Sequence, residues 1–251
     1  MHHEIPKTIA PRFDRGRHSR GRIGFVILAT EPLLESEMIK IAPPDIGVHF
    51  SRVAMADELT AENLMDQLSK IPQAASLLLA DGQLDVLCYA CTSGSIVMGE
   101  AQIVECLRAG MPGAIPTTLI SCVLAAFRKL NINKIAVATP YIPEINDRLR
   151  AYLAGSGVDV VNIGGLELTR DIDIAHVDPR FLIEFAKHVD RPDAEAIFLS
   201  CSALRASEVA AEIEEQVGKP VVTSNQAMLW NCLRLANVSD KLGGYGRLFL
   251  Q

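Results

Sequence analysis

The sequence lacks a long apolar run, and so it lacks the signal of a transmembrane helix, which needs about 18 or more consecutive apolar residues. Residues 1–22 are polar, so we expect no secretory leader, no membrane partner and a cytoplasmic location. The phosphate-binding patterns GxGxxG and GxxxxGKS/T are absent, and the six histidines have no metal-ligand spacing. Nucleotide binding and a histidine-based metal centre therefore have no support.

A second zinc-type cysteine pair is also missing. Cys88 and Cys91 form one CxxC, but no other CxxC follows and no histidine cluster accompanies it. Cys88 lies inside an apolar run that reads as a strand, so we assign it to the core and Cys91 to the position just past the strand. The sequence predicts reduced thiols and no metal site.

Charge is unevenly distributed. The net charge is −6, and residues 1–22 carry +4, which leaves −10 for the rest of the chain. An acidic body argues against nucleic acid as a partner. We expect residues 1–22 to form a flexible, solvated basic tail rather than a nucleic-acid-binding arm.

Strand-like and helical stretches alternate along the rest of the chain, which predicts an α/β fold with parallel sheets covered by helices on both faces. Such sheets carry their sites beyond the carboxyl ends of the strands. The expected strands are 23–29, 48–54, 86–90, 115–118, 134–139, 158–163, 196–200 and 220–224, and the expected helices are 61–80, 96–109, 121–130, 142–155, 179–188, 206–217 and 225–235.

The chain repeats itself. Residues 115–132 align without gaps to 221–238, 85–93 align to 195–203, and 28–30 align to 137–139, so three segments recur at offsets of 106 to 110. Recurrence in the same order favours a true duplication over the general likeness of strand–helix units. Each half then carries a cysteine at the end of a strand, and two halves that face each other place Cys91 and Cys201 across one cleft.

Both cysteines precede hydroxyl residues at a turn into a helix. Backbone N–H groups at a helix start bind anions and lower a thiol pKa, so we expect a carboxylate site and reactive thiols there. The alternative is that both cysteines are ordinary buried apolar residues, and their matched places in the repeat favour the catalytic interpretation.

These residues carry a resemblance to the aspartate/glutamate racemase superfamily, in the branch of maleate cis-trans isomerase and arylmalonate decarboxylase, with the ectoine-utilisation proteins of that branch nearest. The matching motifs are YACTSG at 89–94, ATPY at 138–141 with Asn146, LSCSAL at 199–204, GKPVVTSNQA at 218–227 and GYGRL at 244–248. They are spread over the chain except for the N-terminal tail.

The resemblance implies two pseudo-symmetric flavodoxin-like lobes, 23–115 plus 225–251 and 116–224, with the active site between them. It also implies chemistry without a metal or organic cofactor, in which Cys91 and Cys201 are the catalytic thiols. Decarboxylase relatives have glycine in place of Cys91, which disfavours decarboxylation. The candidate substrate-binding residues are Thr30, Glu31, Thr92, Ser93, Tyr141, Asn146, Asp171, Ser202 and Ala203.

Two positions depart from the pattern of the maleate isomerases, which carry asparagines that contact the substrate where this chain has Glu31 and Asp171. A carboxylate repels a dicarboxylate and pairs with an ammonium group, so both replacements indicate an amino-bearing substrate. The alternative is that one or both side chains point to solvent or are misaligned.

The leading hypothesis is a cofactor-independent isomerase or racemase that uses two cysteines on a small carboxylate, an amino acid or N-acyl amino acid. The second is a maleate cis-trans isomerase in which Cys91 adds to the double bond. The third is a non-catalytic protein that binds a small carboxylate. The resemblance further implies a homo-oligomer, either a dimer or a tetramer.

Overall fold

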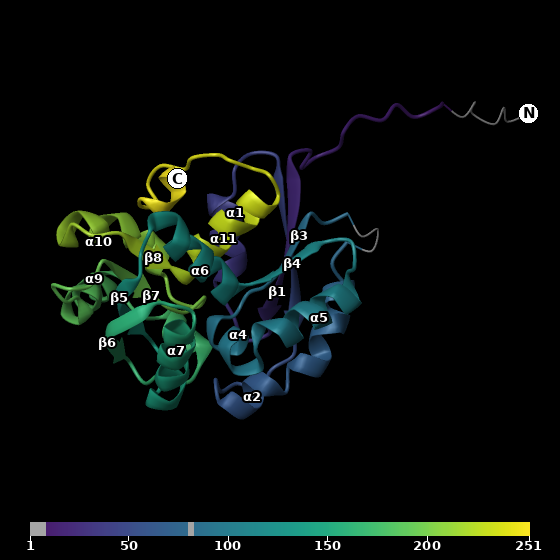
Figure 1. The fold of residues 1–251 in the computed structure, drawn as a ribbon. Helices are drawn as coiled ribbons and strands as arrows, with labels where there is room; N and C mark the ends of the chain where they lie inside the picture. Colours follow the sequence, from purple (N-terminus) through teal and green to yellow (C-terminus); the bar gives the residue numbers. More distant parts are fainter. Residues whose placement is uncertain (1–8, 80–82) are drawn as a thin grey trace, which may run out of the picture.

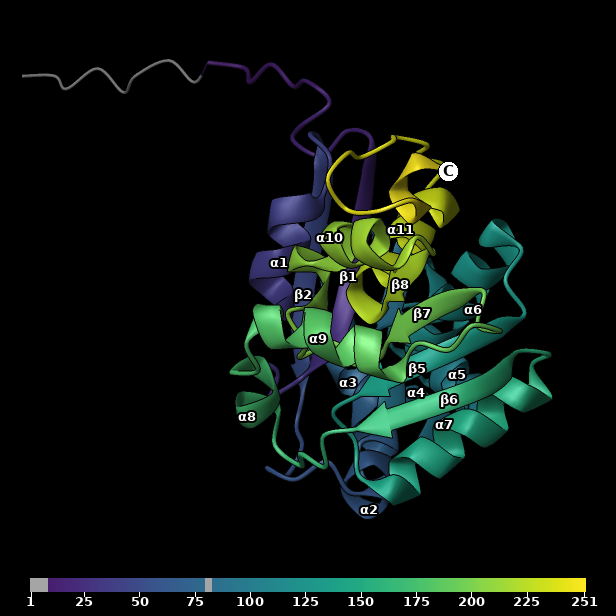
Figure 2. The same ribbon diagram turned by 90° about the vertical axis from the view of Figure 1, so that its left-hand side faces the viewer.

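The computed structural model describes residues 9–79 and 83–251, which form two four-stranded sheets with every strand pair parallel. The sheets have the matching strand orders β2-β1-β3-β4 and β6-β5-β7-β8, and Figures 1 and 2 show them in two adjacent lobes. All eight expected strands are present, and the predicted α/β class is confirmed. The strands are β1 (Gly21–Leu28), β2 (Ile46–Val53), β3 (Val86–Tyr89), β4 (Ile115–Thr118), β5 (Lys134–Thr139), β6 (Asp159–Gly165), β7 (Ala196–Leu199) and β8 (Val221–Thr223).

The helices flank both faces of each sheet. Helices α3 and α5 lie against one face of the first sheet, and α1 and α11 lie against the other. The α-helices are α1 (Leu34–Ile41), α2 (Ala61–Met65), α3 (Ile71–Ser76), α4 (Thr92–Met98), α5 (Glu100–Gly110), α6 (Leu119–Leu130), α7 (Pro143–Gly155), α8 (Asp171–Ala175), α9 (Pro179–Val189), α10 (Ala210–Val217) and α11 (Ser224–Leu235), and short 3₁₀ turns occupy Leu68–Lys70, Ala206–Glu208 and Leu248–Leu250.

Several helix predictions were wrong in extent. The helix expected over 61–80 is divided into α2, a 3₁₀ turn and α3, with Pro72 in the first turn of α3, and residue 80 lies outside the described residues. The helix expected from 96 begins instead at residue 92 and is broken by Gly99, whose φ of +83° interrupts the helical path. Helix α1 was not predicted, although Leu34, Met38 and Ile41 form its buried face.

Two helices lie between the sheets. Helix α6 contacts both β4 of the first sheet and β8 of the second, and α11 contacts β8 as well as β1, β3 and β4. We propose that α11 belongs to the first lobe and α6 to the second, so that the lobes are 23–115 plus 225–251 and 116–224. All four residues of β4, Ile115–Thr118, are register partners of β3 residues. The first sheet therefore extends past the boundary between residues 115 and 116.

Helices α6 and α11 begin at equivalent threonines. Thr118 caps α6 by accepting from the Ser121 amide, and Thr223 caps α11 in a reciprocal pair with Gln226. These caps differ by 105 residues rather than the 106 of the ungapped sequence alignment, because the structure pairs Thr118 and not Thr117 with Thr223. The two halves therefore repeat both the order of their strands and the threonine that caps the following helix.

The chain before the first sheet has little regular structure. Residues 9–20 form neither helix nor strand and are mostly exposed, and β1 begins at Gly21 rather than at the expected residue 23. Arg20 pairs with Asp240 near the other end of the chain. Within residues 9–79 and 83–251, none of the helices has the length and apolar character that crossing a membrane requires.

Candidate active site

Cys91 lies at the junction of β3 and α4. It is the N-cap of α4, and its Sγ accepts a hydrogen bond from the Gly94 amide at 3.3 Å and lies 3.5 Å from Ser93 Oγ. A side chain at position 94 would collide with the hydroxyl of Tyr89, so glycine is needed for this close approach. The sequence motif therefore builds a polar cradle for one sulfur in an otherwise apolar setting.

Cys201 follows β7, but no helix begins there. Its φ is +142°, a region that side-chain-bearing residues rarely adopt and that costs on the order of 1–3 kcal/mol. The next residues form a turn, and the Cys201 amide donates to Ser224 Oγ at 3.0 Å. The second thiol is thus held in a strained backbone by a contact from another element.

Ser224 joins the two thiol-bearing segments. It is the first residue of α11, is fully buried, and its Oγ also lies 2.9 Å from Thr92 Oγ1, the residue after Cys91. Ser224 was not among the predicted site residues, although it lies inside the motif at 218–227. Its partners are 23 and 132 residues away, so only the packing of α11 reveals this role.

The hydroxyl of Tyr141 lies close to both thiols. Tyr141 is 2% exposed and accepts from Ser200 Oγ at 3.4 Å. The pKa of its hydroxyl is raised well above the usual value, first by burial and then by the nearby charges that Cys201 and Cys91 can carry. The lobes therefore bring Cys91, Cys201 and Tyr141 within electrostatic range of one another.

Burial raises the pKa of both thiols. It raises the pKa of Cys91 to about 11, although Ser93, the Gly94 amide and Tyr89 oppose the shift. Burial and then the charge of Asp171 raise the pKa of Cys201 well above its usual value. The expectation of a lowered thiol pKa was wrong, because loss of hydration outweighs the donors at the helix start.

Asp171 is the charged group that faces both thiols. It is the first residue of α8, is 3% exposed, and accepts from Thr30 Oγ1 at 2.5 Å. The segment before it is fastened to the first lobe, since Thr169 O accepts from the Leu59 amide at 2.7 Å and Arg170 pairs with Asp57 at 2.8 Å. Burial raises the pKa of the Asp171 carboxyl.

Glu31 has a different place. It is 1% exposed, and its carboxylate accepts from the amides of Leu33 and Leu34 at 2.9 and 2.7 Å. Its carboxylate oxygens therefore accept hydrogen bonds from the backbone at the start of α1. Burial raises its pKa to about 7, and Asp171 adds to this shift, so the two carboxyls are neighbours. Neither one points to solvent.

Three further candidates have defined contacts. Asn146 accepts from Thr139 Oγ1 at 2.7 Å and donates to the carbonyl of Tyr141 at 3.2 Å, so its amide holds the loop that carries Tyr141. The backbone of Ala203 is hydrogen-bonded to Cys201 and lowers its pKa. Ser202 is 3% exposed, and its carbonyl accepts from Asn225 Nδ2 at 2.8 Å.

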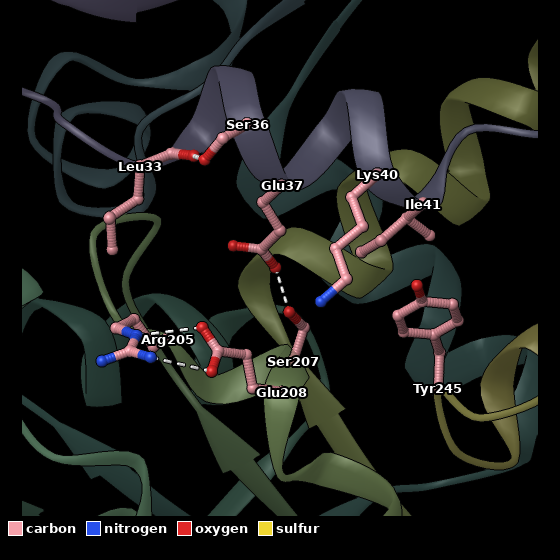
Figure 3. Close-up of a pocket in the computed structure, with 9 residues that line it drawn as sticks. All are labelled: Leu33, Ser36, Glu37, Lys40, Ile41, Arg205, Ser207, Glu208 and Tyr245. Atoms are coloured by element: carbon pink, nitrogen blue, oxygen red, sulfur yellow. Dashed lines mark hydrogen bonds and ion pairs between the residues drawn. The ribbon is translucent and has the colours of Figure 1, made fainter.

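A pocket of about 220 Å³ lies between α1 and the segment that carries Arg205, Ser207 and Glu208 (Figure 3). Glu37 points into it from α1 toward Ser207, whose hydroxyl donates to the carboxylate, and Asn225 Nδ2 donates to the same carboxylate at 2.8 Å. Asn225 therefore connects the pocket to Ser202, and neither Asn225 nor Glu37 was found from the sequence. The lining residues are Leu33, Ser36, Glu37, Lys40, Ile41, Arg205, Ser207, Glu208 and Tyr245.

Comparisons with known proteins agree with this architecture. The chain is 28% identical to the maleate isomerase of Geobacillus stearothermophilus over 90% of this chain and 96% of that protein, and 36% identical to the arylmalonate decarboxylase of Bordetella bronchiseptica over 53% and 57%. A solved structure of a cysteine-to-serine variant of the Nocardia farcinica maleate cis-trans isomerase, with a covalently bound succinylcysteine intermediate, has a TM-score of 0.85 at 22% identity, and the match covers 92% of this chain and 98% of that one. The family model described as arylmalonate decarboxylase matches residues 37–249. The chain therefore belongs to the arylmalonate decarboxylase family, which includes maleate isomerases within the aspartate/glutamate racemase superfamily.

Proposed function

We propose that the protein is a cofactor-independent isomerase or racemase that acts with Cys91 and Cys201 on a small carboxylate bearing an amino or acylamino group. The observation that carries the proposal is the convergence of two thiols, the Tyr141 hydroxyl and one buried carboxylate, Asp171, in a single site. The assignment to the ectoine-utilisation members, the cytoplasmic location and a homo-oligomer are parts of the same proposal.

The substrate carboxylate is held by neutral donors. Ser93 and Ser202, which are 2% and 3% exposed, supply two hydroxyl groups. Tyr141 and Thr92 supply two more. Neutral donors aimed at a carboxylate stabilise it most when it gains charge, as it does when the α-carbon loses a proton and an enediolate develops. The site then lowers the barrier to proton removal rather than only binding the substrate.

The amino group is recognised by Asp171, and this recognition also activates the thiols. Burial, with the charge of Asp171 as a further cause, raises the pKa of both cysteines. A substrate ammonium group beside Asp171 offsets that charge, so a thiolate becomes easier to form, whereas a neutral acylamino N–H only donates a hydrogen bond to the carboxylate. A dicarboxylate adds negative charge and has the opposite effect. Thiolate formation is therefore coupled to the correct substrate.

The reaction removes one proton from the α-carbon and adds another to its opposite face. The thiolate of one cysteine takes the α-proton and becomes a thiol, the C–H electron pair enters the enediolate, and the thiol of the other cysteine gives its proton to the opposite face of the α-carbon. The second sulfur is left as the thiolate, so the reverse reaction starts from the opposite protonation state. No oxidant or co-reactant is required.

The test is a panel of amino acids, N-acetylated diamino acids and maleate incubated with the protein in D₂O and followed by NMR. We expect α-deuteration with inversion of a compound from the amino-bearing set and slow or no isomerisation of maleate. The Cys91→Ser/Cys201→Ser protein is the control. Fast isomerisation of maleate without α-deuteration of any amino compound would overturn the proposal.

A second function is favoured by the comparisons: maleate-type isomerisation, in which the Cys91 thiolate adds to an alkene, the C2–C3 bond rotates and the thiolate is eliminated. Its support is the likeness to proteins named maleate isomerases, one of them carrying a succinylcysteine intermediate. Mass spectrometry separates the two functions, since only the addition route leaves a covalent adduct on Cys91 in a Cys201→Ser protein. Saturable carboxylate binding without turnover of any compound would instead support the non-catalytic alternative.

A further inference from the structure

Three cysteines outside the active site converge in the core. Cys88 comes from β3, Cys122 from α6 and Cys232 from α11, and their sulfurs all lie within 4.8 Å of one another. All three side chains are fully buried, and all are free thiols. The three residues come from segments far apart in the sequence, so the cluster exists only because α6 and α11 meet beside the first sheet.

Packing alone does not require sulfur at this place, as the second half of the molecule demonstrates. The repeat equates Cys88 with Phe198 through the 110-residue offset of β3 and β7, and the capping threonines equate Cys232 with Phe127. Phe198 and Phe127 fill their position with a T-shaped ring pair at 5.6 Å. One half thus uses ordinary apolar packing where the other gathers thiols.

Polar groups reach the cluster from its rim. Asn231 Nδ2 donates to Cys122 Sγ at 3.4 Å, and Thr117 Oγ1 lies 3.7 Å from the same sulfur. Donors of this kind stabilise sulfur that carries negative charge, as it does when bound to a metal. Asn231 is only partly buried, so the polar rim of the cluster reaches toward the surface of the protein.

We propose that Cys88, Cys122 and Cys232 form a binding site for one Cu(I) ion. With metal–sulfur distances of about 2.3 Å, as in thiolate zinc sites, three sulfurs around one ion lie about 4 Å apart, so the observed cluster needs only a small contraction. Thiolates select soft ions such as Cu(I). On binding, the ion forms bonds to sulfur and the displaced thiol protons pass to solvent, with no change in oxidation state.

The number of ligands selects the ion. Zn²⁺ in structural sites takes four ligands, and among residues 9–79 and 83–251 the group of close-lying ligand atoms contains only these three cysteines. Asn231 and Thr117 contact Cys122 through an amide nitrogen and a hydroxyl, which are poor partners for a soft ion. A three-coordinate site closed to bulk water therefore fits Cu(I) better than Zn²⁺.

The test uses the Cys91→Ser/Cys106→Ser/Cys201→Ser protein, in which the only remaining cysteines are those of the cluster. Anaerobic titration with Cu(I) against bicinchoninate is expected to give one ion per chain, and Cu K-edge absorption is expected to report three sulfur ligands. Because the ion binds the folded chain, the melting temperature should rise by about 5–10 °C at saturating metal.

A fourth substitution provides the control. Adding Cys122→Ala should weaken Cu(I) binding by about 100-fold or more, whereas wild type and the Cys106→Ser protein should match each other. If the Cys122→Ala protein does not fold, the absorption spectrum of the three-cysteine protein decides alone. Fewer than three sulfur ligands, or tighter binding of Zn²⁺ than of Cu(I), overturns the proposal. None of these readouts depends on catalysis.

Discussion

The two halves of the molecule share one strand order but hold their thiols differently. Cys91 has an ordinary extended backbone, with a φ of −136°, and caps a helix whose amide reaches its sulfur. Cys201 has a φ of +142° and precedes a turn, and its amide is held by Ser224 from α11. A duplicated fold therefore supplies the positions of the two thiols but not equal surroundings.

The difference teaches how the two positions are maintained. The Cys91 cradle is local, since its donors at positions 93 and 94 are encoded beside it and form as soon as α4 forms. The Cys201 position depends on tertiary structure, because its strain persists only while α11 and the first lobe are packed. We expect the Cys91 side to tolerate changes at a distance and the Cys201 side to be sensitive to them.

The largest effect is expected from removing either thiol. Cys91→Ser and Cys201→Ser should each lower kcat/KM by about 10³-fold or more, because each removes a group that transfers a proton in the transition state. Each variant should still exchange the α-proton of one enantiomer, which NMR in D₂O measures. Circular dichroism should find both folded. Full activity in either variant would contradict the two-thiol mechanism.

The next effect concerns the shared carboxylate. Asp171→Asn should weaken an amino-bearing substrate by about 10²-fold and improve a dicarboxylate, because one charge is removed from a site closed to water. The same change should lower the pKa of both thiols, since the charge of Asp171 raises them, so iodoacetamide should react faster at a given pH. Glu31→Gln is the matched control, and a similar selectivity change in that variant would show that Glu31 also reads the substrate.

A smaller effect sharpens the contrast between local and tertiary support. Ser224→Ala removes the acceptor of the Cys201 amide and the partner of Thr92, and it should lower kcat by about tenfold with little change in KM. Ser207→Ala, a buried serine that contacts Glu37 instead, should leave kcat nearly unchanged. Equal losses in the two variants would mean that Ser224 acts only through stability.

The smallest effect is on stability. Glycine relieves a strained positive φ but adds chain entropy to the unfolded state. Cys201→Gly gains from relief, whereas Cys91→Gly loses the cap and has no strain to release. The first substitution should therefore cost at least about 1 kcal/mol less in free energy of unfolding than the second, as urea titration measures. The reverse order would argue that Cys201 is not strained.

Much of this arrangement can be predicted from the sequence. Strands have a recognisable apolar pattern, the repeat recurs at a nearly constant offset, and Cys91 and Cys201 each directly follow a predicted strand. All eight strands follow from these signals, and the repeat predicts that Cys91 and Cys201 share one site. The glycine at position 99 marks the break between α4 and α5, but the helical spacing of the apolar residues around it predicts one continuous helix. Ser224 and Asn225 could not be assigned, since their roles depend on the packing of α11 between the two sheets. The unequal roles of Glu31 and Asp171 depend on side-chain direction, which no spacing encodes.

The placement of Asp171 also has a consequence for the reaction of the two thiols with oxidants. Peroxides attack thiolates, and a protonated thiol is far less reactive. A resting molecule whose thiols are 3% and 6% exposed, and are kept protonated by burial and a neighbouring carboxylate, offers oxidants little to react with. In the proposed mechanism, the vulnerable thiolate forms only when a substrate fills the site and excludes other reagents. Under the proposed function, the carboxylate that selects the substrate also protects the two thiols from oxidation between turnovers.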